Sequence, residues 1–222
     1  MRIAVINETS AAERNADILK ALGGRGHEVR NVGMRKNGEP PELQYVHTGL
    51  MAGLLLHVGQ ADLVVGGCGT GQGFLNAAMQ YPGVCCGHLV SPLDAWLFAQ
   101  INDGNCISLM LNQSYGWASD VNLRLLFDAY FGVERGQGFP PHRQEPQRAS
   151  RARLALLSGL THRSWAEIVA ELPADLLDPV LTYPGFRELL DAGLAGDAGL
   201  RVELSRRTPI ESDPFTRGVL TR

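Results

Sequence analysis

A cysteine and a threonine lie within a run of glycines at residues 64–73, Val-Val-Gly-Gly-Cys-Gly-Thr-Gly-Gln-Gly. The apolar residues 61–65 predict a buried strand before the glycines, and residues 74–80 follow them with a helical pattern. Such a turn lets several backbone N–H groups point at one spot, where they bind an anion. Converging N–H dipoles also favour a thiolate, so Cys68 is a candidate base or nucleophile, with Thr70 beside it.

The spacing around Cys68 argues against several other chemistries. The glycines are followed by no Gly-Lys-Ser/Thr and lack the spacing of a dinucleotide fingerprint. A phosphatase loop of the Cys-x5-Arg type would need an arginine where Phe74 stands. A thiol hydrolase would need a nearby histidine; His88 is the only candidate, and a packed histidine is the simpler interpretation. A tight turn whose cysteine merely fills space is the structural alternative.

A second pair of polar residues, Asn7 and Glu8, follows the apolar strand predicted at residues 2–6. A helical pattern over residues 11–22 and another strand at 27–32 complete a βαβ unit, which predicts parallel strands. Open parallel sheets build their sites at the carboxyl ends of the strands, where these two residues would lie. Capping of the following helix is an equally simple role for Glu8.

The pattern of strand and helix continues to residue 131 and predicts an α/β fold. We expect a doubly wound, five-stranded parallel sheet of the Rossmann-like type, with strand order 2-1-3-4-5. The further predicted strands cover residues 62–67, 84–90 and 105–111, and the further helices cover 43–58, 74–80, 92–101 and 115–131.

The chain changes character after residue 135. Glycine, proline and polar residues dominate residues 136–148, which predict a linker between an α/β domain at 1–135 and a helical C-terminal extension at 149–222. Short helical patterns reach residue 200, and the last twenty residues are expected to form a polar tail. Short helices bury little apolar surface on their own, so the extension is expected to pack on something, such as a partner subunit.

Composition limits the partners and the compartment. The 222 residues are 45% hydrophobic and carry a formal net charge of −3, which gives no reason to expect nucleic acid or an acidic membrane as partner. No apolar run is long enough to span a membrane, and the first residues form a strand pattern rather than a signal peptide. The four cysteines have no metal-site spacing, so we expect a cytosolic protein without a metal.

Several segments together resemble one enzyme family. The segments 67–73, 77–78 and 82–84 (Gly-Cys-Gly-Thr-Gly-Gln-Gly, Ala-Ala and Pro-Gly-Val) are similar to those of the ribose-5-phosphate isomerase B family, which includes the galactose-6-phosphate isomerase subunits. The opening Met-Arg-Ile-Ala-Val-Ile-Asn-Glu, Tyr45 and the turn Asn102-Asp103-Gly104-Asn105 match in register. The resemblance covers roughly residues 1–135.

This resemblance implies aldose–ketose isomerisation of a sugar phosphate through an enediolate, without metal or organic cofactor. Cys68 would be the base, the Thr70 hydroxyl and the loop amides would form the anion hole, and Glu8 would position a hydroxyl. The substrate-binding residues that we expect are Asn7, Tyr45, Gly67, Gly69, Gly71, Gln72, Gly73, Asn102 and Arg143. The family also implies a homodimer or homotetramer with sites at the subunit boundary.

Departures from the family pattern concern ring opening and phosphate binding. Ile101 and Thr9 stand where the family has histidines, and Asn112 stands where it has an arginine. The phosphate-binding segment is replaced by residues 136–143, in which Arg143, or Arg135 just before, is a candidate substitute. We therefore expect a substrate other than ribose 5-phosphate, such as a tetrose phosphate or a differently anchored sugar. A sensor that binds a sugar phosphate without catalysis is the alternative, although such a protein has no need of Cys68.

Overall fold

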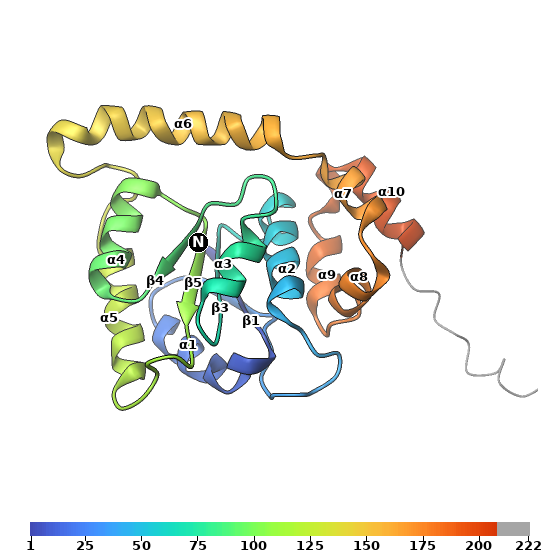
Figure 1. Cartoon of the computed structure of the whole chain (residues 1–222), viewed down its shortest axis with the longest axis horizontal. Coiled ribbons are helices and arrows are strands. Elements are labelled where there is room, and N and C mark those ends of the chain that lie inside the picture. The colour runs from blue at the N-terminus through green and yellow to red at the C-terminus, as the bar shows by residue number, and fades with distance from the viewer. Residues whose placement is uncertain (208–222) are drawn as a thin grey trace, which may run out of the picture.

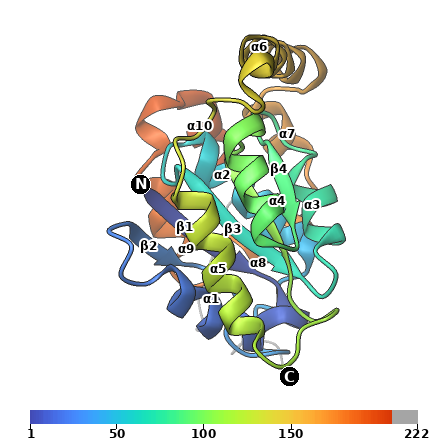
Figure 2. The ribbon, with the colours of Figure 1, turned by 90° about the vertical axis from the view of Figure 1, so that its left-hand side faces the viewer.

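The computed structural model describes residues 1–207 and contains a five-stranded parallel sheet with helices on both faces. The sheet runs in the order β2-β1-β3-β5-β4 (Figures 1 and 2). The strands are β1 (Arg2–Asn7), β2 (Glu28–Asn31), β3 (Leu63–Cys68), β4 (Cys86–Leu89) and β5 (Cys106–Met110). The predicted fold class, a doubly wound parallel α/β sheet, is confirmed.

The predicted strand order was wrong at one edge of the sheet, because β5 lies between β3 and β4. β5 is an apolar strand whose first four residues are buried, as an inner strand requires. β4 has only four residues, among them Gly87 and His88, and three of the four are half-buried. These properties suit an edge strand, which is covered on fewer sides.

Two groups of helices cover the two faces. One face carries α1 (Asn15–Leu22), α4 (Pro92–Leu97) and α5 (Ser119–Phe131), and the other carries α2 (Tyr45–His57) and α3 (Gln72–Ala78). α4 begins as its sequence predicts: the Ser91 hydroxyl accepts the N–H of Asp94 at 3.2 Å, and Pro92 takes the first position. α5 begins four residues later than expected, because Ser114 and Ala118 adopt positive φ angles in the preceding loop.

The C-terminal helices pack against α2 and share its hydrophobic core. They are α7 (Trp165–Glu171), α8 (Ala174–Leu181), α9 (Phe186–Asp191) and α10 (Ala198–Arg207). The buried Trp165 ring stacks on Tyr81 with ring centres 5.2 Å apart. The predicted capping box of α7 is confirmed in Ser164 and Glu167. Of the expected polar tail, residues 203–207 belong to α10 and the rest lie outside the described residues.

Helix α6 (Gln144–Thr161) lies apart from this packing, along the amino ends of the strands (Figure 1). It begins within the segment expected to be a linker, and none of its 18 residues is buried. Polar contacts attach it: Arg151 donates to the carbonyl oxygens of Ile101 and Gly136 at 2.8 and 2.7 Å, and the Ser158 hydroxyl accepts the N–H of Gly83 at 2.9 Å. Figure 2 shows it nearly end-on above the rest of the chain.

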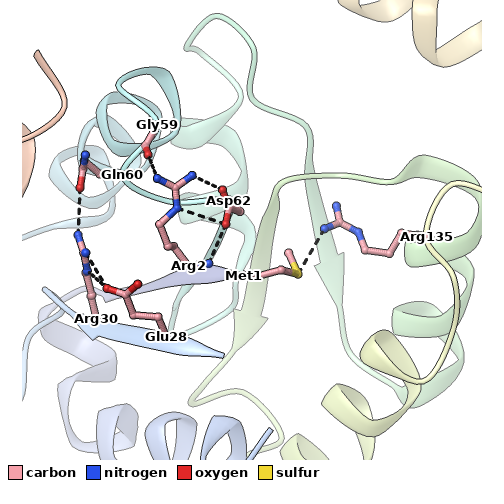
Figure 3. A network of polar contacts seen from close by, with 8 residues as sticks. All are labelled: Met1, Arg2, Glu28, Arg30, Gly59, Gln60, Asp62 and Arg135. Carbon is pink, nitrogen blue, oxygen red and sulfur yellow. Dashed lines mark hydrogen bonds and ion pairs between the residues drawn. The ribbon is translucent and has the colours of Figure 1, made fainter. Parts of the chain in front are cut away.

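Charged and polar side chains form a surface network at the same amino ends (Figure 3). At its centre Arg2 pairs with Asp62 at 2.5 Å, and the Arg2 guanidinium lowers the pKa of that carboxyl. Both side chains are about two-fifths exposed, so solvent screens the pair and it contributes little to stability. The other members drawn are Met1, Glu28, Arg30, Gly59, Gln60 and Arg135. Within residues 1–207, no helix combines the length and apolar character that crossing a membrane requires.

Candidate active site

Cys68 is the last residue of β3, a central strand, and its side chain is buried where the glycine turn begins. Its sulfur lies 4.0 Å from the hydroxyl oxygen of Thr70, so the predicted pair of groups is side by side. Gly71 then adopts φ +77°, a left-handed conformation that glycine allows, and becomes the N-cap of α3. A Cβ atom there would also stand 2.5 Å from Nε2 of His88.

The turn after Cys68 leaves three consecutive backbone N–H groups available. Those of Gly69, Thr70 and Gly71 donate to no acceptor among the described residues. Two of the carbonyl groups accept hydrogen bonds instead: that of Gly69 accepts the N–H of Asn112 at 3.0 Å, and that of Gly71 accepts the Ser108 hydroxyl at 2.5 Å. These two carbonyls therefore fix the turn to β5 and to the loop after it, while the three amides are available to bind an anion.

Glu8 lies beside this turn at the carboxyl end of β1 and is only 4% exposed. Its backbone N–H donates to the Gly67 carbonyl at 3.4 Å, across the strand pair. Its carboxylate accepts both the N–H of Ser10, at 3.1 Å, and the Ser10 hydroxyl. Glu8 thus caps the 3₁₀ helix η1 (Thr9–Arg14), so the capping role is realised beside the site. Gly67 itself is needed for close packing, because a Cβ would collide with the Leu109 carbonyl.

Asn7 is completely buried, and its amide is already engaged within the fold. Both donor positions are used, toward the carbonyl oxygens of Ala11 at 2.9 Å and Met34 at 3.0 Å. Its oxygen accepts from the Asn15 amide at 2.5 Å. These contacts hold the loops around the end of β1, which places Glu8 and η1.

Tyr45 and Gln72 line the α2 side of the turn. Tyr45 is the first residue of α2, is 45% exposed, and lies so close to Gly73 that a Cβ there would be 2.9 Å from the ring. Gln72 shares a hydrogen bond of 3.0 Å between its side-chain nitrogen and Nδ1 of His88. His88 therefore positions Gln72, a role that the sequence alone did not suggest.

Asn102 and Arg143 lie at the other end of the sheet. Asn102 ends the π-helical turn Phe98–Asn102 before β5, at the amino ends of the strands. Arg143 belongs to the short helix Pro141–Arg143, and the preceding segment is bonded to that turn through the N–H of Gly138 and the Gln100 carbonyl, at 2.7 Å. Since β3 has six residues, roughly 17 Å of strand separates this end from Cys68. One chain does not bring these two residues to the thiol.

The positions that depart from the family pattern have structural partners. Thr9 shares a hydrogen bond with Asn37 at 3.2 Å, and Ile101 is half-buried at the amino ends. Asn112 donates to the Ser10 carbonyl at 2.6 Å and so joins η1 to the loop after β5. Ser10 and Asn112 both approach Gly69, at 3.5 Å from the position of a Cβ. Sequence reasoning missed Ser10, whose only signal was its place directly after Glu8 and Thr9.

The fold and site define a parallel α/β protein with a thiol and a glycine turn at the carboxyl end of a central strand. The family model for ribose/galactose isomerases matches residues 3–126. The chain therefore belongs to the ribose/galactose isomerase family and is a sugar isomerase, which confirms the family and the enzyme class expected from sequence.

Solved structures extend the similarity through the C-terminal helices. A 4-deoxy-L-threo-5-hexosulose-uronate ketol-isomerase, solved with a tartrate, is 36% identical at a TM-score of 0.88; the match covers 93% of this chain and 99% of that one. A ribose-5-phosphate isomerase from Vibrio parahaemolyticus is 38% identical at a TM-score of 0.82, and the match covers 87% of this chain and 92% of that one. Ribose-5-phosphate isomerase B from Clostridium thermocellum shares the fold, with 20% identity and a TM-score of 0.60. That match covers 73% of this chain and 100% of the other. A comparison with curated protein sequences gives no significant match.

Proposed function

We propose that this isomerase interconverts the aldose and ketose forms of an anionic sugar through an enediolate, with Cys68 as the base and no metal or organic cofactor. One observation carries the proposal: a buried thiol directly precedes three backbone N–H groups that have no acceptor among the described residues. A base next to an anion hole is what removal of a weakly acidic proton beside a carbonyl requires.

The proton transfers balance with these groups alone. The Cys68 thiolate takes the proton from C2 of the aldose; the C–H electron pair forms the C1–C2 double bond, and the carbonyl pair moves onto O1. The amides of residues 69–71, with the Thr70 hydroxyl, stabilise that charge. The thiol returns the proton to C1, and the hydroxyl proton of O2 passes to O1, which leaves a ketone at C2. We assign one of these hydroxyls to Glu8, and its backbone bond to Gly67, the residue before Cys68, supports this assignment.

We assign the substrate to the acidic sugars. The sequence resemblance favours a sugar phosphate, and one similar structure is a ribose-5-phosphate isomerase. Another is a uronate ketol-isomerase, whose sugar carries a carboxylate instead. Because the expected histidines and arginine are replaced by Ile101, Thr9 and Asn112, ribose 5-phosphate itself is not the substrate that we propose.

The working form that we propose is a homodimer in which each site uses two chains. Asn102 and Arg143 would reach the site from a second copy, since they lie at the opposite end of the sheet from Cys68. Exposed leucines of α6 support a contact between copies: Leu154, Leu156, Leu157 and Leu160 are 51–72% exposed. Sedimentation with Leu157→Glu and Leu160→Glu tests this, because a dimer that survives both charges does not use α6.

Proton exchange in D2O tests the reaction. Tetrose, pentose and hexose phosphates and hexuronates would be incubated with the enzyme while their C1 and C2 protons are followed by NMR. Exchange should occur with one acidic sugar, disappear in Cys68→Ala, and persist in Cys86→Ala, which removes a thiol from the edge strand. Exchange that survives Cys68→Ala would overturn the assignment of the base. Binding without exchange would support the sensor, and a clear preference for ribose 5-phosphate would overturn our substrate assignment.

A further inference from the structure

The guanidinium of Arg14 has no carboxylate partner in the part of the chain that the structure describes. Arg14 is the last residue of η1, and its guanidinium lies 4.5 Å from the centre of the Tyr115 ring. Within the described residues the Arg14 side chain forms no hydrogen bond or ion pair, and its Nε is buried without a partner. A buried donor that lacks an acceptor destabilises a folded chain, so a water molecule or a bound ligand is expected to accept the Arg14 Nε–H.

The neighbouring carboxylate that could neutralise Arg14 is held by another group. Asp17 lies three residues further along, a spacing at which opposite charges on a helix normally pair. Its carboxylate instead accepts the Tyr115 hydroxyl at 2.7 Å. Burial, together with this hydrogen bond to Asp17, raises the pKa of Tyr115, so the phenol keeps its proton and remains a donor to Asp17. Tyr115 therefore contacts both residues: its hydroxyl donates to Asp17, and its ring stacks against the Arg14 guanidinium.

Two successive contacts relate Arg14 to the reacting groups. η1 and the loop after β5 first meet beside Gly69, where the Asn112 amide donates to the Ser10 carbonyl at 2.6 Å. They meet again where Arg14 covers Tyr115. At the rise of a 3₁₀ helix, four residues separate the two contacts by roughly 8 Å. That span is comparable to the distance from the reacting carbons of a sugar to the far end of its chain.

We propose that Arg14 binds the anionic group at the far end of the substrate, while Cys68 and the amides act on C1 and C2. This inference rests on the proposed function. A guanidinium is planar, presents several donors and binds a phosphate or a carboxylate through two parallel hydrogen bonds. Stacking on Tyr115 holds that plane in place before the substrate arrives. The anchor belongs to the same chain as Cys68, so it does not depend on a second copy.

The test compares Arg14→Gln and Arg14→Lys with Arg201→Gln, which changes an exposed arginine on α10. Calorimetry with inorganic phosphate and with tartrate measures anion binding without turnover. Arg14→Gln should weaken the anion that binds the wild type by roughly 10- to 100-fold, as expected for loss of a charge-assisted hydrogen bond. Arg14→Lys keeps the charge but not the planar guanidinium, so its affinity for the anion should lie between those of Arg14→Gln and the wild type. Arg201→Gln should bind the anion as tightly as the wild type.

Kinetics with the acidic sugar that shows exchange separate this inference from the proposed function. Arg14→Gln should raise KM by a similar factor with a smaller change in kcat, and the wild-type KM should rise with ionic strength. If exchange is normal but Arg14→Gln changes neither anion binding nor KM, Arg14 is not the anchor. If anion binding depends on Arg14 but no sugar exchanges its protons, the role of Arg14 in anion binding is supported and the proposed isomerase mechanism is wrong.

Discussion

Two inactive variants should restore each other's activity if each site is built from two chains. Cys68→Ala removes the proposed base, and Asn102→Ala removes a group that we place in the partner's site. In a mixed dimer one site carries both defects and the other carries none. Mixing the two variants should therefore produce exchange that neither produces alone.

The expected magnitude follows from the sheet register and from random association. Val64 pairs with Cys106 and Cys68 pairs with Met110, so four strand residues, or roughly 13 Å, separate the start of β5 from the thiol. Asn102 lies four residues before that start, and a sugar cannot contact both residues within one chain. Random mixing makes half of the dimers mixed, each with one intact site of two, which gives about a quarter of wild-type activity at equal chain concentration.

The assay is solvent exchange at C1 and C2 after the two variants are co-expressed with different affinity tags, which show that mixed dimers form. Cys68→Ala mixed with Glu8→Gln is the matched control. Both of these residues lie at the carboxyl ends of one chain's strands, so each site of their mixed dimer carries one defect and no rescue is expected. Mixed dimers of Cys68→Ala and Asn102→Ala that stay as inactive as the parents would refute the shared site, and an Asn102→Ala parent with normal activity would refute the role of Asn102.

Three further predictions concern stability. Gly71→Ala forces a side chain into φ +77° against His88 and should lower the free energy of unfolding by about 1–3 kcal/mol, so an unchanged urea midpoint contradicts it. Trp165→Ala empties the buried site beside Tyr81 and should cost about 3–5 kcal/mol in the same assay; a loss below 1 kcal/mol would mean that the C-terminal helices hardly depend on it. Burial lowers the pKa of His27 from its ordinary 6.5, so the unfolded chain takes up the proton first as the pH falls. The stability that neutral His27 contributes above pH 6.5 should be lost as the pH falls through the folded pKa, and His27→Gln should flatten this dependence in unfolding curves between pH 7.5 and 5.

The sequence predicted the parts of the site that are close together along the chain. A strand that ends in glycines predicted the position of Cys68, its neighbour Thr70 and the turn, because local periodicity and glycine chemistry determine them. The short, half-polar sequence of β4 is also typical of an edge strand. The predicted order instead followed the general rule that strands consecutive in the sequence lie side by side, and that rule fails here.

Contacts between distant segments could not be predicted in the same way. The pairing of Arg14 with Tyr115 joins residues 101 positions apart, and it depends on where the loop after β5 ends and α5 begins. Helical periodicity placed that start at residue 115, whereas the positive φ angles of Ser114 and Ala118 move it to Ser119. An alanine at positive φ has no clear signature in a sequence, because tertiary contacts, rather than the residue type, offset the backbone strain of that conformation.

The position where the family resemblance places an arginine connects these observations. Asn112 is short enough to donate to the Ser10 carbonyl at 2.6 Å, and this bond draws η1 toward the loop after β5. The next contact between the same two segments is Arg14 on Tyr115. Under the proposal for Arg14, the loop after β5 supplies no cation at position 112, and the anion is held instead from η1, on the β1 side of the site.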